Sequence, residues 1–563
     1  MPAQVVLLLL LAAAMALYLI VDGVRGRKKL LRRLRKNFGA VPDSTYRRAS
    51  LDHYWREYQA AHPQEESVDD LTWDDLDLEA VFERVNACLT LIGEDYLYAL
   101  LHRQLGEEAL REREKLLGLL EEEPLRLRVQ TALARLGKRT GTDLAEVLFH
   151  PETFALGGKA RFWCAALAPL AALPLVLFYP PLAGLWLLLT LGHNLWLYLG
   201  TQKKLEGRLE TVSYLTAALR CGRSLQKELK GRSPALAAQL GQAAVLGKKL
   251  GGGAALLSPS PQSDAYMLVQ VLGMVTLFPI LQYQRTARVL EQSQRELCRF
   301  FELLGELDAS LAILSYRHSL DAYVRPHFLP GLEVRAKGLR HPLLTEAGCV
   351  PNDAAIVKNW LLTGSNASGK STFIKAVALN LILAQNIFTC TAEQFELGRA
   401  PVVTSMAARD DVTAGESYFV AEIKSMRRVV ARAERGETFY CFIDEVLKGT
   451  NTAERIAASG AVLRYLCAPG CRCVAATHDL ELTGLLAAAY ENHHFSEQVD
   501  PAGVSFDYKL KDGPCRTRNA IRLLDHYRFP AGLVADARAA VEAEAAARGG
   551  PAAPIRKRGV EMP

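Results

Sequence analysis

The sequence has no large excess of charge of either sign. It contains 67 lysine and arginine residues against 61 aspartate and glutamate residues, a formal net charge of +6 over 563 residues. Such a balance describes a mixed, solvated surface and is no signature of a nucleic-acid-binding chain. The length allows about three or four domains of ordinary size.

The cysteines lack the spacing of a metal site. The chain has 11 of them, and the closest group, Cys467, Cys471 and Cys473, follows a C-x3-C-x-C pattern without a second pair of ligands. Structural zinc sites take four ligands at characteristic spacings. We therefore interpret these residues as reduced thiols in a cytosolic core, in preference to a zinc site.

No basic residue precedes the first apolar run, Val5–Val21. A cleaved signal peptide carries basic residues ahead of its apolar stretch, whereas here they follow, in Arg25–Lys36. At 1.5 Å per residue the run reaches roughly 25 Å, just enough to cross a thin hydrocarbon core. We expect a transmembrane anchor of the bacterial inner-membrane type, with the N-terminus outside and the rest of the chain in the cytoplasm. The basic stretch also suits a helix lying on anionic lipid, and both arrangements can hold together.

A second apolar region, Phe162–Gly200, is divided by the tight turn Tyr179–Pro181. Each half is about one membrane span long, and basic residues flank both ends, which predicts a transmembrane hairpin with cytoplasmic ends. The alternative is a buried helical hairpin in a soluble core. His193 and Asn194 are too few polar groups for an ion path and are interpreted as helix-packing contacts. The flanking basic residues are Lys159, Arg161, Lys203 and Lys204.

The rest of the chain changes character at about Val334. Before it, apolar residues recur at spacings of three and four, which is typical of helices. The Gly/Ser/Pro-rich stretch Gly247–Asp264 interrupts this pattern, and we expect it to be a flexible loop. After Val334, short β-like runs alternate with helices, which predicts an α/β domain with a largely parallel sheet.

The α/β region contains a phosphate-binding loop. The run from Gly364 to Ser371 matches G-x-x-x-x-G-K-[ST], follows a hydrophobic strand pattern and opens a helix. In such a loop the glycines let backbone N–H groups approach phosphates, the lysine contacts the β- and γ-phosphates, and the hydroxyl binds Mg²⁺. We therefore predict ATP and Mg²⁺ as cofactors. The candidate nucleotide-binding residues are Gly364, Ser365, Asn366, Ala367, Ser368, Gly369, Lys370, Ser371 and Thr372.

An acidic pair and a histidine end two further strand-like runs. YCFIDE ends in Asp444, a candidate Mg²⁺ ligand together with Ser371, and in Glu445, which can orient or deprotonate the attacking water. VAATHD brings His478 to the end of another strand, where it can sense the γ-phosphate. A lone histidine there is more often a strand-end cap, but this one is the third of three ordered motifs. We therefore predict that Glu445 and His478 act in catalysis.

Four motifs stand in a fixed order, namely TGSNASGKST, AGESYFVAEIKSM, FIDEVLKGTNTAER and AATHDLEL. Together they resemble the ATPase domain of the MutS family of DNA mismatch repair proteins. RHPLL and VPND upstream and YRFPAGLVADARAAV downstream extend the likeness, and LTWDDLDLEAVFERVNACLTLIGEDYLYALL and FFELLGELDASLAILSYR resemble the start and end of the family's helical core more weakly. The hairpin would then be inserted where that core sends out its lever and clamp helices.

The resemblance implies a homodimer with composite ATP sites, related by two-fold symmetry. In that arrangement Ser417 of one subunit reaches the γ-phosphate in the partner's site, and the loop Gly449–Thr452 communicates across the dimer. Two features depart from the family. The first 66 residues leave no room for its mismatch-reading domain, and Cys349 stands where the family commonly has an aromatic residue near the adenine.

The predicted fold class is an α/β P-loop ATPase domain of the ABC-type, MutS-like kind, preceded by a mainly α-helical core domain with three transmembrane helices. The predicted domains are a transmembrane anchor at 1–22, a basic juxtamembrane connector at 23–66, a helical core in two parts at 67–158 and 205–332, a transmembrane hairpin at 159–204, an ATPase domain with C-terminal dimerisation helices at 333–545, and a disordered tail at 546–563.

Three functions compete at this point. The first is a membrane-anchored MutS-family ATPase coupled to DNA binding. The second is an ABC transporter, which would need an L-S-G-G-Q-type signature where this chain has AGESYF. The third is an ATP-driven membrane or signalling module that acts on an unidentified protein partner without DNA. We favour the first function and retain the third as the alternative.

Overall fold

The computed structural model describes residues 3–547, apart from 44, 140–141, 251–270, 272, 346–347, 366–367, 407–417, 448–450, 501–502, 516–520, 522–523 and 525–527. The chain divides into two compact units. A helical unit contains Met1–Val68, Leu78–Tyr323 and Leu383–Thr389, and an α/β unit contains Asp69–Asp77, Val324–Ile382 and Cys390–Pro563. The predicted tail and most of the predicted loop Gly247–Asp264 lie outside the described residues.

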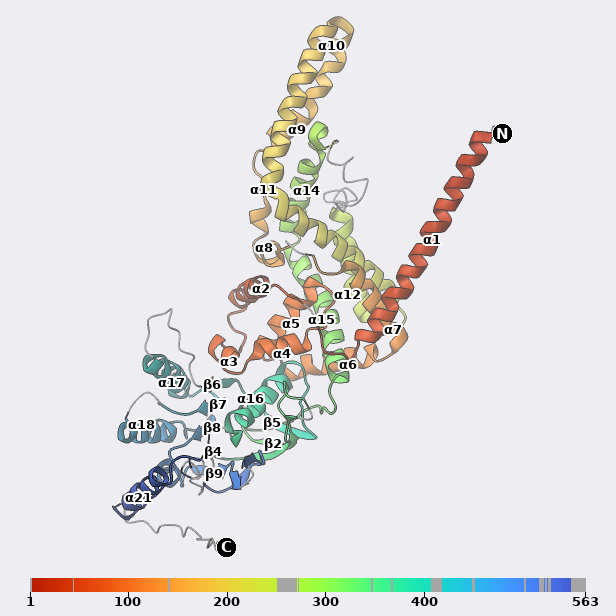
Figure 1. The fold of residues 1–563 in the computed structure, drawn as a ribbon. Coiled ribbons are helices and arrows are strands. Elements are labelled where there is room, and N and C mark those ends of the chain that lie inside the picture. Colours follow the sequence, from red (N-terminus) through yellow and green to blue (C-terminus); the bar gives the residue numbers. More distant parts are fainter. Residues whose placement is uncertain are drawn as a thin grey trace. The chain divides into compact units, whose positions relative to one another are not determined.

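The helical unit is built from α-helices and two short 3-10 helices (Figure 1). Its described elements are α1 (Ala3–Asn37), α2 (Arg48–Ala61), α4 (Leu78–Val85), α5 (Leu91–His102), α6 (Glu107–Leu120), α7 (Glu123–Leu136), α8 (Leu144–Phe149), η1 (Pro151–Phe154), α9 (Lys159–Leu167), η2 (Ala168–Ala171), α10 (Ala172–Phe178), α11 (Pro180–Leu229), α12 (Pro234–Leu250), α14 (Phe278–Gln292) and α15 (Gln294–His318).

A buried carboxylate joins α15 to the start of α5. Asp308 accepts hydrogen bonds from the backbone N–H of Leu89 (3.1 Å) and Thr90 (2.8 Å) and from the Thr90 hydroxyl (2.6 Å). These bonds hold the Asp308 carboxylate at the start of α5, where negative charge is favoured. Burial raises the pKa of Asp308 to about 6 in spite of these bonds. The contact fixes the centre of the helical core.

A long apolar hairpin extends from this core (Figure 1). α9, η2 and α10 form its first arm, Tyr179 ends that arm, and Pro180 begins α11, because proline suits the first turn of a helix. The indole N–H of Trp186 donates to the carbonyl of Ala168 (2.8 Å) and ties the two arms together. α11 then continues without a break from the hairpin into the core, so one helix connects the two regions.

The described residues contain two helical segments that are long and apolar enough to cross a membrane, Pro151–Phe178 and Pro180–Lys203. Only 17% and 22% of their most apolar windows are buried, so they do not behave as core helices of this unit. The prediction of three transmembrane helices is therefore not supported. Val5–Val21 lies within α1, but the side chains of residues 3–16 are not described, and this first span stays a prediction.

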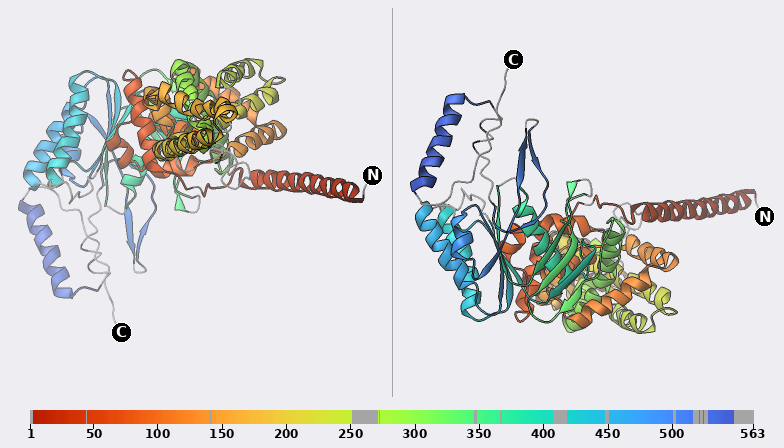
Figure 2. Two further views of the ribbon diagram at one scale, coloured as in Figure 1. Left: turned by 90° about the horizontal axis from the view of Figure 1, so that it is seen from above. Right: turned by 90° about the horizontal axis from the view of Figure 1, so that it is seen from below.

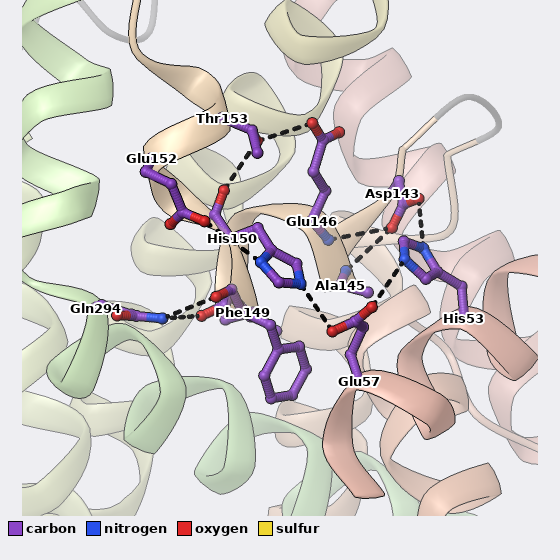
Figure 3. A network of polar contacts seen from close by, with 11 residues as sticks. His53, Glu57, Asp143, Ala145, Glu146, Phe149, His150, Glu152, Thr153 and Gln294 are labelled. Carbon is purple, nitrogen blue, oxygen red and sulfur yellow. Dashed lines mark hydrogen bonds and ion pairs between the residues drawn. The ribbon is translucent and has the colours of Figure 1, made fainter. Parts of the chain in front are cut away.

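A polar network holds the segment just before the hairpin (Figure 3). Glu57 of α2 lies between two histidines: it contacts His150 Nε2 at 2.8 Å and His53 Nε2 at 3.7 Å. His53 Nδ1 is also 2.9 Å from Asp143, the residue that caps α8. The hydrogen bond with Glu57 is the main cause of the raised pKa of His150. The network ties α2 to the α8–η1 segment, from which the first arm departs.

The α/β unit contains, among its described residues, a six-stranded sheet in the order β12-β9-β4-β8-β7-β6 and a four-stranded sheet in the order β1-β5-β2-β3. β9, β4, β8, β7 and β6 run parallel to one another, as predicted for a largely parallel sheet. The strands are β1 (His327–Leu329), β2 (Val334–Leu339), β3 (Asn352–Ile356), β4 (Asn359–Thr363), β5 (Gln394–Gly398), β6 (Val402–Ser405), β7 (Phe439–Asp444), β8 (Cys471–Thr477), β9 (Tyr490–His494), β10 (Glu497–Asp500), β11 (Gly503–Phe506) and β12 (Lys511–Asp512).

Helices cover the parallel sheet. Apolar residues of α17, α18 and α19 share one buried cluster with β4, β6, β7 and β8, and Figure 1 shows α16 on the other side of these strands from α17 and α18. In Figure 2 the blue β10–β11 ribbon stands out from the sheets of this unit. The described helices are α3 (Asp70–Asp75), α16 (Lys370–Asn386), α17 (Tyr418–Glu434), α18 (Thr452–Tyr465), α19 (Glu481–Leu485) and α21 (Ala531–Ala547).

The two units are interleaved along the chain. α3 belongs to the α/β unit, where Asp75 accepts hydrogen bonds from the Thr404 hydroxyl (2.7 Å) and the Met406 N–H (3.0 Å). The end of α16 belongs to the helical unit, where the Asn386 carbonyl accepts from Arg113 (2.6 Å). The predicted domains are mostly consecutive stretches of the chain, so they do not include this exchange of short segments between the two units.

Candidate nucleotide site

Three strands of the parallel sheet bring the predicted motifs to one edge. β4 ends at Thr363 before the phosphate loop, β8 ends at Thr477 before His478, and β7 ends at Asp444. Thr363 pairs in register with Thr477, and Asp444 pairs with Ala476. Since parallel strands end at the same edge, the three motifs meet there. Ligands of open α/β sheets bind outside this edge.

The phosphate loop needs its two glycines. Gly364 has a φ of 140°, and a Cβ atom there would lie 2.5 Å from the carbonyl oxygen of Phe495. Gly369 has a φ of 104°. Both conformations strongly favour glycine. The Ser368 hydroxyl closes the loop by donating to the carbonyl of Ser365 (2.7 Å). Asn366 and Ala367 lie outside the described residues.

Lys370 lies inside this loop and is 1% exposed. Its ammonium group donates to the carbonyls of Gly364 and Ser365, both at 2.7 Å. A buried ammonium needs such acceptors, since desolvating a charge without partners is very unfavourable. The contacts hold the cation where a loop-bound phosphate would lie. Ser371 is partly buried and Thr372 exposed on the first turn of α16.

The acidic pair follows β7 through a sharp backbone turn. Glu445 has a φ of 65°, and its N–H donates to the carbonyl of Ala476 (3.0 Å). A non-glycine residue in this region is strained, and such strain is often found at functional sites. Asp444 Oδ1 is buried and has no hydrogen-bond partner within the described part of the chain. A buried carboxylate oxygen of this kind suits a hard cation, with the Ser371 hydroxyl as a second oxygen ligand.

His478 and Glu445 are in direct contact. His478 Nε2 lies 2.5 Å from Glu445 Oε1. The loop after β8 is held by a double ion pair, in which Arg455 of α18 contacts both oxygens of Asp479 at 2.7 and 2.8 Å. From the sequence, Glu445 and His478 have separate predicted roles, and neither their contact nor the support from Arg455 is predicted. The bidentate Arg–Asp geometry restricts where His478 can point.

An aromatic side chain lies beside the phosphate loop. Tyr508 has a φ of 51° and a partly exposed ring, and a Cβ atom on Gly369 would be 3.1 Å from its Cδ1. The Asn352 side chain donates to the Tyr508 carbonyl (2.9 Å) and fixes this position. Tyr508 is not predicted from the sequence, where Cys349 is the residue considered for the adenine, since nothing in the local pattern SFDY places Tyr508 near the loop.

Two predicted features of the dimer cannot be placed. Ser417 and the first half of the Gly449–Thr452 loop, Gly449 and Thr450, lie outside the described residues. Asn451 is described, and its side chain caps α18 by accepting from the N–H of Glu454 (3.0 Å). α18 therefore links this loop to Arg455 and the histidine loop.

Comparisons with known proteins identify the region that carries the site. Residues 360–544 match the family MutS domain V. The chain is 32% identical over 291 residues to the DNA mismatch repair protein MutS of Sorangium cellulosum, 33% over 275 residues to that of Thermus thermophilus, and 31% over 275 residues to that of Geobacillus kaustophilus. These matches cover 49%, 48% and 46% of the chain and 31%, 33% and 30% of the relatives. The chain thus spans about a third of the length of the curated relatives that it matches. It contains the MutS-type ATPase region, with helices ahead of it.

Proposed function

We propose that the chain is a membrane-tethered ATPase of the MutS family that hydrolyses ATP in the composite sites of a homodimer and couples this cycle to DNA binding. The observation that carries the proposal is the meeting of loop, acidic pair and histidine at one sheet edge, inside a region that matches MutS domain V. Each motif alone would be weak, but their order and common location suit phosphoryl transfer to water.

The chemistry follows from the positions of the side chains. Loop N–H groups and Lys370 bind the phosphates, and Glu445 orients the attacking water and takes up its proton. His478 touches the same carboxylate and so limits the directions in which Glu445 can point. Ser371 and Asp444 would hold Mg²⁺, which neutralises charge on the β- and γ-phosphates when bound.

The tether is the apolar hairpin of α9, η2, α10 and α11. Its side chains are mostly exposed although they are mostly apolar, and lysine and arginine flank its base but not its tip. A bilayer would cover such a surface and place the base at the cytoplasmic side. The apolar run of α1 is a second proposed anchor, with the N-terminus outside.

The dimer and the DNA partner rest on the MutS likeness. A subunit that lends Ser417 to its partner's site would close on ATP and pull on the helices attached to the α/β unit. The relatives are DNA mismatch repair proteins by name, and DNA is the first partner to test.

The test is the ATPase rate of full-length protein in detergent with no DNA, matched duplex or mismatched duplex, each at two salt concentrations. We expect stimulation by duplex that weakens with salt, because phosphate contacts release counterions. Lys370→Ala should lose ATP binding, whereas Glu445→Ala should bind ATP and hydrolyse it about 10² to 10⁴-fold more slowly. Wild-type hydrolysis by Glu445→Ala would show that Glu445 is not the general base.

A rate that ignores all DNA would favour the second candidate, an ATP-driven membrane or signalling module that acts on a protein partner. The observation behind it is α11, which runs unbroken from the apolar hairpin into the helical core. Such a helix could transmit a conformational change between the membrane hairpin and the helical core without any nucleic acid.

A further inference from the structure

A third apolar run lies beside the hairpin in the helical unit. Residues 265–284 carry no charged side chain, and the described part of this run, residues 271 and 273–277, leads into α14. The described residues form a helix that breaks at Leu277, whose φ is 53°.

The run is held against the base of the hairpin. Asn194 of α11 is 1% exposed, and its side-chain N–H donates to the carbonyl of Val275 (2.8 Å). The ring of Tyr198 lies so close to Gly273 that a Cβ atom there would be 2.9 Å from it. Leu277 packs into the same buried cluster as Phe162 and Tyr198.

The bond from Asn194 has a physical reason. Pro279 has no N–H, so the carbonyl four residues earlier, that of Val275, loses its helical donor. In an apolar environment a freed carbonyl must find another partner, and neighbouring side chains supply it. Asn194 does so here. The polar residue inside the predicted span is thus the donor that allows a broken helix to lie against α11.

The outer face of the described part of this run and of the start of α14 is apolar and exposed. Val271, Val275 and Phe278 are 56%, 40% and 37% exposed. Val271 and Val275 are four residues apart and lie on one side of the short helix, and Phe278 begins α14 directly after the break at Leu277. This face adjoins the exposed apolar surface of the hairpin, since α14 packs on α9 and α11. We call these three residues the apolar foot.

Aromatic and basic side chains surround the hairpin at the same level. Trp163 and Trp196 are exposed on its two arms, and the Arg161 guanidinium lies 6.0 Å from the Trp196 ring. Tryptophan and arginine are enriched at the membrane–water interface. Trp196 stands between Asn194 and Tyr198, the two residues that contact the third run. We call these aromatic and basic side chains the belt, and the apolar foot therefore lies at the same level along the hairpin as the belt.

We propose that the apolar foot lies in the headgroup–acyl boundary of the cytoplasmic leaflet, where the contact from Asn194 to the Val275 carbonyl holds it beside the membrane hairpin. The inference rests on the proposed membrane tether and adds a lipid contact to it. A lipid surface fits better than a protein partner, because the apolar face continues into the hairpin surface and cationic side chains at the belt suit anionic headgroups.

The test uses full-length protein reconstituted in vesicles with anionic lipid. A polarity-sensitive dye is attached to Val271→Cys or Val275→Cys in a Cys164→Ala background, because Cys164 is exposed in the native chain. Spin-labelled lipids with shallow or deep quenchers report depth. Leu177→Cys near the hairpin tip is the positive control, and Gln292→Cys, exposed at the far end of α14, is the negative control.

We expect shallow quenching at both foot positions, since an interfacial face lies roughly 5–10 Å into the headgroup–acyl boundary. Leu177→Cys should be quenched by lipid, and Gln292→Cys should not. Asn194→Leu should reduce quenching at Val275→Cys and leave Leu177→Cys unchanged.

Each contrary outcome has a separate meaning. Quenching at position 177 with foot labels that behave like position 292 would refute the foot and leave the tether standing. No lipid quenching at any position would refute the tether as well. Disulfide crosslinking of Val275→Cys between copies, without lipid quenching, would assign the face to a second copy of the chain. Unchanged quenching in Asn194→Leu would refute the role of Asn194.

Discussion

Burial sets the charge of single residues in the helical unit. His102 of α5 is buried, stacks on Trp55 with ring centroids 4.5 Å apart, and its Nδ1 lies 2.9 Å from the Tyr98 carbonyl. Burial lowers the pKa of His102 to about 3, so the folded protein keeps a neutral imidazole there. Asp308 shows the opposite effect, since burial favours the neutral form of an acid and raises its pKa.

The lowered pKa of His102 predicts a loss of stability in acid. The ring takes up a proton in the unfolded chain below about pH 6.5, but in the folded chain only near its lowered pKa of about 3. The contribution of His102 to the free energy of unfolding is therefore fully present above about pH 6.5. It is lost as the pH falls from about 6.5 towards 3, by up to about 1.4 kcal/mol per pH unit. The measurement is the thermal unfolding midpoint by circular dichroism at pH 7 and pH 5.

His102→Gln provides the comparison. The variant should be less sensitive to this pH step than the wild type. His341 in the α/β unit, whose pKa is lowered to about 4 mainly by burial, is present in both proteins and cancels in the difference. Equal pH sensitivity of variant and wild type would contradict the assignment.

At the scale of elements, α18 supports the sheet edge where the phosphate loop, the acidic pair and His478 meet. Its N-terminus is capped by Asn451, which belongs to the loop that the MutS resemblance implies in dimer communication, and Arg455 near the same end binds Asp479. Asp479 follows His478 directly in the chain. Movement of the α18 N-terminus would thus move the histidine loop, and with it the contact to Glu445.

We expect Arg455→Ala to reduce the catalytic rate with little change in ATP affinity. Losing the bidentate ion pair frees the histidine loop but leaves the phosphate loop intact. The measurement is kcat by phosphate release together with Kd for a fluorescent ATP analogue. Arg464→Ala, an exposed position on the same helix, is the matched control and should behave as wild type. A large loss of ATP affinity in Arg455→Ala would contradict this positioning role.

At the scale of the whole molecule, the chain combines a MutS-type ATPase region with an apolar hairpin that leaves the helical unit. Each compact unit takes a short segment from the other's part of the chain, α3 in one case and the end of α16 in the other. A chain that crosses between units at several points offers several covalent connections along which a change in the α/β unit could reach the helical unit.

A charge in the middle of the hairpin should weaken membrane retention. Leu188 is exposed within the apolar part of α11, Pro180–Lys203, and a lysine at the centre of a membrane span is unfavourable by about 2.5–3.5 kcal/mol. Leu188→Lys should release more protein from vesicles at high salt, while its ATPase rate in detergent stays at the wild-type level. Leu188→Met is the control for side-chain size. Full retention of Leu188→Lys in flotation assays would argue that the hairpin is not in the bilayer.

The sequence alone determined which motifs make up the candidate nucleotide site and their order along the chain. Glycines, a lysine and an acidic pair at the ends of apolar runs indicate phosphate binding wherever the sheet places them, because the motif depends on local backbone geometry. Hydrophobic patterning likewise predicted a helical part, a largely parallel sheet and the two arms of the hairpin. Of the three membrane spans that it predicted, two correspond to long apolar segments among the described residues, and the first, Val5–Val21, stays a prediction.

Only the tertiary structure decided which distant residues meet. The contact of Glu445 with His478, the support from Arg455 and the position of Tyr508 beside Gly369 depend on strand register and loop packing. The same holds for Asn194, which sequence analysis interpreted as a packing contact without knowing its partner. Its partner is the Val275 carbonyl that Pro279 leaves without a helical donor. Local patterns specify which elements form, whereas contacts between elements depend on the backbone path that joins them.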